Sequence, residues 1–336
     1  MISKGRLLLF SLFLSLLVSC PQKTQTVSDR VFRALDFTAP LPNNNYEYYD
    51  VPALRIAVGD WCEIYIEVGQ SISNKDLFNL MKTFDTVIFP LVRDSFAPAV
   101  DESGRLAPWV DINADNRIAI LLLDIRDGYT ENSGYIGGYF SSTDFSAGND
   151  MDILYIDINP GEIGSSEFYG TIAHELQHLT NYAYSAAHLS RPMQALWINE
   201  GLSSAAEYLY LGAFDWRIAW YSDHGQRFYN NQESEIPLGN NFYVWHGERE
   251  QDNSTATLDN YATVYLFFQW LRIQASHSSL YTENDDGRRV YKDLFSASNG
   301  DHRSVVSLAS SKIDGNLDSW EKLLEAWHLA NILGDD

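Results

Sequence analysis

Basic residues and long apolar segments are both scarce in this 336-residue chain. Only 23 Lys and Arg stand against 45 Asp and Glu, so the formal net charge is −22. Such a charge repels nucleic acid and anionic membrane surfaces, and no nucleic-acid partner is expected. The acidic residues are spread along the chain, which is typical of a solvated surface. No internal repeat is present, and a hydrophobic content of 45% is enough for a sizeable folded core.

The N-terminal apolar run, Leu7 to Val18, is 12 residues long and therefore too short to span a bilayer comfortably. It follows two basic residues and ends in Leu17-Val18-Ser19-Cys20. This segment resembles the lipobox of bacterial lipoproteins, in which the chain is cut before the cysteine and the thiol is lipidated. The alternative is an ordinary secretory signal that happens to contain a cysteine.

The lipobox resemblance implies a lipid anchor at Cys20 in the bacterial cell envelope, at the outer membrane or the cell surface. Position 21 is Pro rather than the Asp that retains lipoproteins in the inner membrane. The membrane would be contacted through the lipid only, and no motif indicates an oligomeric state. With Cys20 lipidated, the one remaining cysteine is Cys62, so neither an intramolecular disulfide nor a cysteine-based zinc site is expected.

Hydrophobic periodicity predicts strands and one helix in the first half of the chain and helices after them. After the signal segment, 1–20, the residues 21–45 are rich in Gln, Thr, Ser, Pro and Asn and are predicted to form a flexible tether. Ser73 and Asn74 are predicted to cap an early helix. The predicted strands cover 55–68 (with a break at Gly59), 117–125 and 152–158, and the predicted helices cover 77–91, 167–185, 192–211, 261–273, 304–311 and 319–332. This order indicates an α+β fold, with a mixed-sheet subdomain over 46–185 and a helical subdomain over 186–336.

The segment His174-Glu175-Leu176-Gln177-His178 lies in the helix predicted over 167–185. Positions i and i+4 of a helix share one face, so both imidazoles can bind one Zn²⁺. Glu175 can reach a water on such a metal and accept its proton when the water attacks a carbonyl carbon. The alternative is a surface helix that carries two solvated histidines.

Glu200 stands 22 residues beyond His178, a gap that allows one loop and a return by an antiparallel helix. It would then complete a His₂Glu set with an open fourth position, as a catalytic zinc requires and a structural zinc does not. The alternative is a first-turn acid that the helix dipole favours.

The segments AHELQH, WINEGLSSAAEY and NYATVYLFFQWL together resemble the gluzincin, or thermolysin-like, metallopeptidases. The likeness is greatest to the hyicolysin family of bacterial neutral metallopeptidases and covers roughly residues 50–330. It implies that His174, His178 and Glu200 bind one zinc ion, and that Glu175 is the general base. It also implies a thermolysin-like fold with the active-site helix between the two subdomains. The implied activity is endopeptidase cleavage of protein or peptide substrates by a metal-activated water.

Two other functions stay open. One is a zinc aminopeptidase, because the Trp-x-Asn-Glu-Gly segment also resembles the gluzincin aminopeptidases. Those enzymes hold the substrate's free amine with a Gly-x-Met-Glu-Asn segment, and Glu131-Asn132 here lacks the preceding Gly and Met. The other is a lipoprotein adhesin or binding module on a metallopeptidase scaffold. Retention of Glu175 and of all three proposed ligands favours the enzyme.

The sequence offers three candidates for the side chain that donates a hydrogen bond to the oxyanion formed during hydrolysis. Tyr261, ahead of an apolar helix, matches the placement of a Tyr that does this in gluzincin aminopeptidases, and a core Tyr is an equal alternative. His224 and His246 are weaker candidates, since thermolysin-like enzymes use a His for this task.

Three further patterns accompany this set of residues. Ser204 and Glu207 fall at i+4 and i+7 from Glu200 and are predicted to orient the histidine ligands, with a solvated face the alternative for Glu207. The strand over 152–158 directly precedes the zinc helix and is predicted to form the rim of the cleft.

The third pattern is a turn before the strand over 117–125. Asp111, Asn113 and Asp115 have the 1-3-5 spacing of Ca²⁺ ligands in a calcium loop. Position 12 of such a loop needs an acid but is Leu122 here, although Asp124 is near. An ordinary polar turn is therefore favoured over a calcium site.

Overall fold

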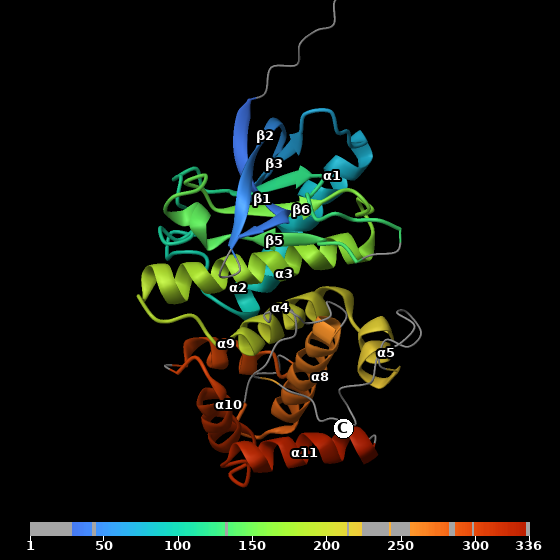
Figure 1. The fold of residues 1–336 in the computed structure, drawn as a ribbon. Helices are drawn as coiled ribbons and strands as arrows, with labels where there is room; N and C mark the ends of the chain where they lie inside the picture. The colour runs from blue at the N-terminus through green and yellow to red at the C-terminus, as the bar shows by residue number, and fades with distance from the viewer. Residues whose placement is uncertain are drawn as a thin grey trace, which may run out of the picture.

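The computed structural model describes residues 29–41, 45–131, 134–213, 215–223, 242, 256–281, 286–297 and 299–333. A sheet lies at one end of the molecule and a group of helices at the other, with helix α3 (Ser166–Tyr182) between them (Figure 1). The predicted α+β fold is confirmed. The signal segment and Cys20 lie outside the described residues. Among the described helices, none is both long and apolar enough to cross a membrane.

Six strands form one mixed sheet in the order β1-β2-β3-β4-β6-β5. The central strands β3, β4 and β6 are parallel, and the pairs β1-β2, β2-β3 and β5-β6 are antiparallel. Every residue of β4 is buried, as its continuous apolar run predicts for a central strand. The strands are β1 (Arg30–Leu41), β2 (Asn45–Val58), β3 (Cys62–Glu67), β4 (Ile118–Leu123), β5 (Gly138–Phe140) and β6 (Ile153–Asp157).

Strand β1 corrects the predicted tether over 21–45 for residues 30–41, whereas 21–28 and 42–44 lie outside the described residues. Phe32 and Ala34 are buried, whereas Val31, before them, and Arg33, between them, are exposed. This alternation has the period of a half-buried strand, and β1 pairs with β2 so that Phe32 lies opposite Val51. The polar composition of the whole segment concealed a short apolar alternation within it.

The predicted hairpin and the first predicted helix are confirmed. β2 and β3 pair antiparallel around a turn at Gly59, whose N–H donates to the carbonyl of Cys62. Ser73 caps helix α1 (Asn74–Thr83) by accepting a hydrogen bond from the backbone N–H of Asp76. The helix continues through a π-helical turn into α2 (Phe89–Ser95). Cys62 is fully buried, as expected for a core residue.

The remaining helices gather on the far side of α3 (Figure 1). Helix α4 begins at Leu196 rather than at the predicted 192. The preceding Ala195 is not helical, with ψ at 144°, and its N–H donates to the carbonyl of Gly300. Helices α5 and α9 were not predicted. One continuous apolar core joins one face of the sheet to these helices. The helices are α4 (Leu196–Leu211), α5 (Asp215–Asp223), α8 (Ala256–His277), α9 (Arg289–Ser296), α10 (His302–Leu308) and α11 (Trp320–Leu333).

Candidate metal centre

Helix α3 carries both histidines of the HELQH segment. Ser165 begins the helix by accepting a hydrogen bond from the N–H of Phe168, and the helix then runs buried under the sheet. His174 and His178 are one turn apart, with ring centroids separated by 4.9 Å. The predicted pairing of the two imidazoles on one helical face is confirmed.

Helix α4 returns beside α3 and brings Glu200 to the two imidazoles. Its Oε2 lies 3.4 Å from His174 Nε2 and 3.4 Å from His178 Nε2. Close approach of α4 to α8 depends on Gly201, since a Cβ there would lie 2.3 Å from the ring of Phe268. In the described part of the chain, one group of three His, Cys, Asp or Glu side chains has all its possible metal-ligand atoms within 4.8 Å of one another. This group is His174, His178 and Glu200.

The spacing of these three atoms fits a shared metal ion better than direct hydrogen bonds. Two ligand atoms on one tetrahedral Zn²⁺, each about 2.05 Å from it, lie roughly 3.3 Å apart. The observed separations are 3.4 Å, and Glu200 Oε2 is buried without a hydrogen-bond partner among the described residues. Imidazole nitrogen and carboxylate oxygen are ordinary zinc ligands. The residues present therefore fit a zinc ion.

Electrostatics hold Glu200 in the form that binds a metal. Burial opposes ionisation of Glu200, but the positive charges of His178 and His174 outweigh burial and lower the pKa of its carboxyl. Burial likewise disfavours the charged form of His174, yet its contacts with Glu200 and Glu207 raise the pKa of its imidazole to about 10. Metal binding would release that proton.

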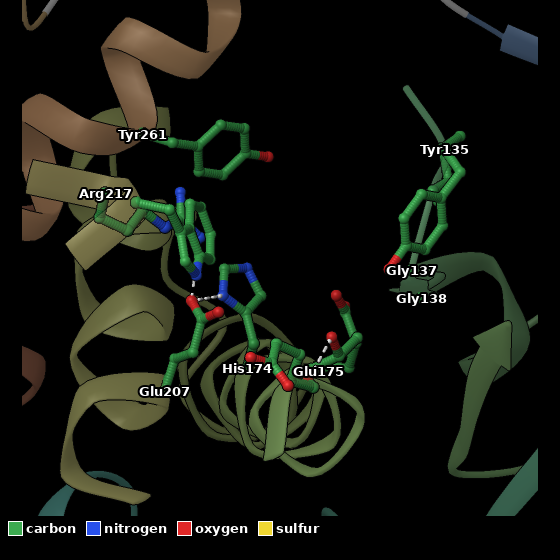
Figure 2. Close-up of a pocket in the computed structure, with 12 residues that line it drawn as sticks. Tyr135, Gly137, Gly138, His174, Glu175, Glu207, Arg217 and Tyr261 are labelled. Atoms are coloured by element: carbon green, nitrogen blue, oxygen red, sulfur yellow. Dashed lines mark hydrogen bonds and ion pairs between the residues drawn. The ribbon is translucent and has the colours of Figure 1, made fainter. Parts of the chain in front are cut away.

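Glu207 holds His174 from the side opposite Glu200. Its Oε2 lies 3.6 Å from His174 Nδ1 and accepts a hydrogen bond of 2.9 Å from the guanidinium of Arg217 in α5. Figure 2 shows the Glu207 carboxylate between the two side chains. Carboxylates in this position fix the tautomer and the orientation of a histidine ligand. Glu207 thus lies beside His174, and its role in orienting this side chain stays a prediction; Arg217 was missed because α5 shows no clear periodicity.

The partner of His178 is Ser203, which corrects the prediction for Ser204. Ser203 Oγ lies 3.0 Å from His178 Nδ1 and donates to Gln177 Oε1 at 2.6 Å. Ser204 is fully buried, and its hydroxyl has no hydrogen-bond partner among the described residues. Positions i+3 and i+4 flank the same helical face, and only the rotation of α4 against α3 selects between them.

A pocket of about 510 Å³ opens onto the metal centre. Residues 135–138 form one wall, α3 forms the floor with His174 and Glu175, and α5 and α8 contribute Arg217 and Tyr261 opposite (Figure 2). Glu175 is 7% exposed and belongs to the pocket rather than to the ligand group. This position suits a base that acts on water or substrate, and that role stays a prediction.

The rim of this pocket is β5, which corrects the prediction for the strand over 152–158. Strand β6 lies inside the sheet between β4 and β5, so neither of its edges is open. β5 is the edge strand, and Gly137 and Gly138 line the pocket. A Cβ on Gly138 would lie 2.9 Å from Thr171 Cγ2 and 2.9 Å from the carbonyl oxygen of Tyr155. The glycine therefore allows the edge strand to lie against α3.

Tyr261 lies at the pocket in the place predicted for an oxyanion donor. Figure 2 shows its hydroxyl directed into the pocket above His174 and Glu175. Burial, and next the charges of Glu200 and Glu175, raise the pKa of the Tyr261 phenol well above its usual value, so the group is a donor at neutral pH. His224 and His246 lie outside the described residues.

None of the known protein-family models matches the chain. The neutral metalloprotease ShpI of Staphylococcus hyicus is 27% identical over 233 residues, which cover 66% of this chain and 46% of that protein. The chain thus spans about half the length of this relative. Among solved structures, native yeast LTA4 hydrolase aligns with 88% of this chain and 43% of its own, at 12% identity and a TM-score of 0.47, too distant to support an argument. The likeness to ShpI and the geometry of His174, His178 and Glu200 both agree with the resemblance of the sequence to the thermolysin-like metallopeptidases.

Proposed function

We propose that the chain is a zinc-dependent endopeptidase that hydrolyses peptide bonds within proteins. The observation that supports this most is the spacing of the buried ligand atoms of His174, His178 and Glu200 at the edge of an open pocket. Zinc, when bound, supplies a Lewis acid and lowers the pKa of a coordinated water. A structural zinc would need a fourth protein ligand, and the described residues place none in this group.

The chain's own residues have separate tasks in this proposal. Glu175 accepts the proton of the attacking water and later delivers it to the leaving amine. The Tyr261 hydroxyl donates a hydrogen bond to the oxygen of the scissile carbonyl as negative charge develops there. The open edge of β5 pairs with the extended backbone of the substrate, as a strand added to the sheet. Gly137 and Gly138 line the pocket at that edge and have no side chains that could block the substrate backbone.

Casein hydrolysis by the purified protein, with and without a zinc chelator, tests the activity. We expect cleavage that stops on chelation and returns with Zn²⁺. Glu175→Gln should retain about one zinc per chain by the stoichiometry of the site, and should lose at least the ~10²–10⁴-fold that a positioned base contributes. Glu167→Gln is the matched control, since Glu167 lines the same pocket from α3 and is exposed.

Two outcomes would change the assignment. A zinc-loaded wild type that cleaves no protein or peptide supports the alternative of an adhesin or binding module. Cleavage of peptides with a free N-terminus, but not of the same peptides after N-terminal blocking, supports an aminopeptidase.

We propose in addition that the chain is a lipoprotein of the bacterial cell envelope, anchored through Cys20. The support is the sequence Leu17-Val18-Ser19-Cys20 after a short apolar run. Cys20→Ser should abolish metabolic labelling with a fatty acid and release the protein from the membrane fraction. Unchanged membrane association in this variant would refute the anchor.

A further inference from the structure

The turn before β4 meets a buried carboxylate that is distant in sequence. Strands β4 and β6 are parallel neighbours, so their N-terminal ends lie at the same edge of the sheet. Asp152 directly precedes β6, and its Oδ1 accepts a hydrogen bond of 3.3 Å from the N–H of Ile112 in the turn. The carboxylate of Asp152 therefore faces the segment that carries Asp111, Asn113 and Asp115.

Two buried oxygens at this place have no hydrogen-bond partner among the described residues. They are Asp152 Oδ2, on a side chain that is 0% exposed, and Asn113 Oδ1. The amide nitrogen of Asn113 donates to Asp115 Oδ2 at 2.8 Å, which leaves the amide oxygen unused. A buried oxygen without a donor costs free energy unless a cation or a water compensates it.

The charges around Asp152 are of one sign. The charges of Asp115 and Asp111 act on the buried Asp152 carboxyl, so the three carboxyl groups are near neighbours. Within the described ranges, no ion pair joins Asp111, Asp115 or Asp152 to a basic side chain. Arg117, the nearest arginine in sequence, donates instead to backbone carbonyls of Gly59 and Asp115.

We infer that Asp111, Asn113, Asp115 and Asp152 form a Ca²⁺ site in which Asp152 takes the place of the missing acid at position 12 of the loop. Leu122 at that position is fully buried in β4, and Asp124 lies at the opposite end of the strand. The donors are all oxygens, which suits Ca²⁺ with its 6–8 ligands rather than zinc. The oxygens of the three carboxylates do not all lie within 4.8 Å of one another, as the ligand atoms of the zinc centre do, so binding requires the loop over 111–116 to approach Asp152.

Bound Ca²⁺ would join two central strands of the sheet at one edge. The loop leads directly into β4, and the backbone N–H of Ala119 donates to the carbonyl of Asp152. The site is separate from His174, His178 and Glu200 and takes no part in hydrolysis. Its expected consequence is stability of the sheet.

Calorimetric titration of CaCl₂ into the zinc-loaded protein tests the site, in buffer freed of calcium by a chelating resin. EGTA is avoided because it would remove the zinc. We expect about one Ca²⁺ per chain, because the four proposed ligand residues make a single site. We also expect a Tm about 5–10 °C higher at a Ca²⁺ concentration roughly 100-fold above Kd. MgCl₂ should produce a smaller shift, because Mg²⁺ demands stricter geometry.

Asp152→Asn keeps the acceptor for Ile112 but removes a ligand charge, and should weaken Ca²⁺ binding about 10-fold or more. Asp150→Asn is the matched control, since Asp150 is an exposed acid two residues earlier, and it should bind like wild type. If Asp152→Asn does not fold, Asn113→Ala in the loop decides, with the same loss expected. The site is refuted if wild type shows neither binding heat nor a Tm shift up to about 10 mM Ca²⁺. Wild-type affinity in a folded Asp152→Asn or Asn113→Ala variant refutes it equally.

Discussion

Glu207→Gln tests whether a carboxylate beside His174 strengthens the metal centre. In the native chain Glu207 Oε2 lies 3.6 Å from His174 Nδ1 and 2.9 Å from the Arg217 guanidinium. Only 9% of the Glu207 side chain and 8% of the Arg217 side chain are exposed, so solvent screens the charges little. Glutamine keeps the shape and can still accept from Arg217, but it lacks the charge that makes the imidazole a better ligand.

The size of the effect follows from this geometry. Partners of a ligand histidine contribute about 10–100-fold to metal affinity, or roughly 1.4–2.8 kcal/mol of binding free energy. Because 3.6 Å is longer than an ordinary hydrogen bond, we expect a loss of about 10-fold, near the lower limit. The weakened contact with Arg217 should also lower the free energy of unfolding by about 1 kcal/mol, because glutamine keeps the hydrogen bond and loses only part of the ~1.5–3 kcal/mol that such a bond to a charged group contributes.

Zinc competition against a fluorescent chelator measures the affinity, and thermal unfolding of the metal-free protein measures the stability. Glu167→Gln is the control, because it removes an equal charge from the same pocket without contact to a proposed ligand. Wild-type zinc affinity in a folded Glu207→Gln variant would refute the argument. An equal loss in Glu167→Gln would show that pocket charge, rather than contact with His174, controls the affinity.

Three other predictions concern the ligand set, the pocket and the helix packing. Glu200→Ala should lose most of the zinc while the metal-free fold persists; full zinc content would show that another group is the third ligand. Tyr261→Phe should retain zinc and lose roughly 10²–10³-fold in kcat if its hydroxyl donates to the oxyanion; an unchanged kcat would make it a core residue. Gly201→Ala places a Cβ 2.3 Å from the Phe268 ring. This substitution should lower the free energy of unfolding by about 1–3 kcal/mol. Gly315→Ala is the control, because there is open space around Gly315, and it should leave the free energy of unfolding unchanged. Equal stability of the two variants would contradict the packing argument.

Features that depend on a few neighbouring residues were predictable from the sequence. The i, i+4 spacing of His174 and His178 needs only a helix, and the helix is there. The Ser73 cap and the apolar run of β4 are equally local. The position of Glu200 beside both histidines was predictable because a short connection separates its helix from α3.

Features that depend on how two elements face each other were not predictable. The choice of Ser203 over Ser204 depends on the rotation of α4 against α3. The rim was assigned to the strand nearest in sequence to α3, whereas the spatial order of strands puts the short β5 at the edge. Strand β1 is stabilised by its pairing with β2, and the polar composition of the surrounding segment, 21–45, concealed it.

The sequence by itself determined the chemistry of the metal centre, because helical periodicity places the two histidines of HELQH together whatever the rest of the chain does. Only the tertiary structure decided what surrounds that chemistry. Arg217 reaches Glu207 from a helix with no clear periodicity, and Asp152 meets the turn at Asp111 because two parallel strands begin at the same edge of the sheet. Such contacts join residues that are distant in sequence, and a pattern within one segment carries no information on which other segment will face it.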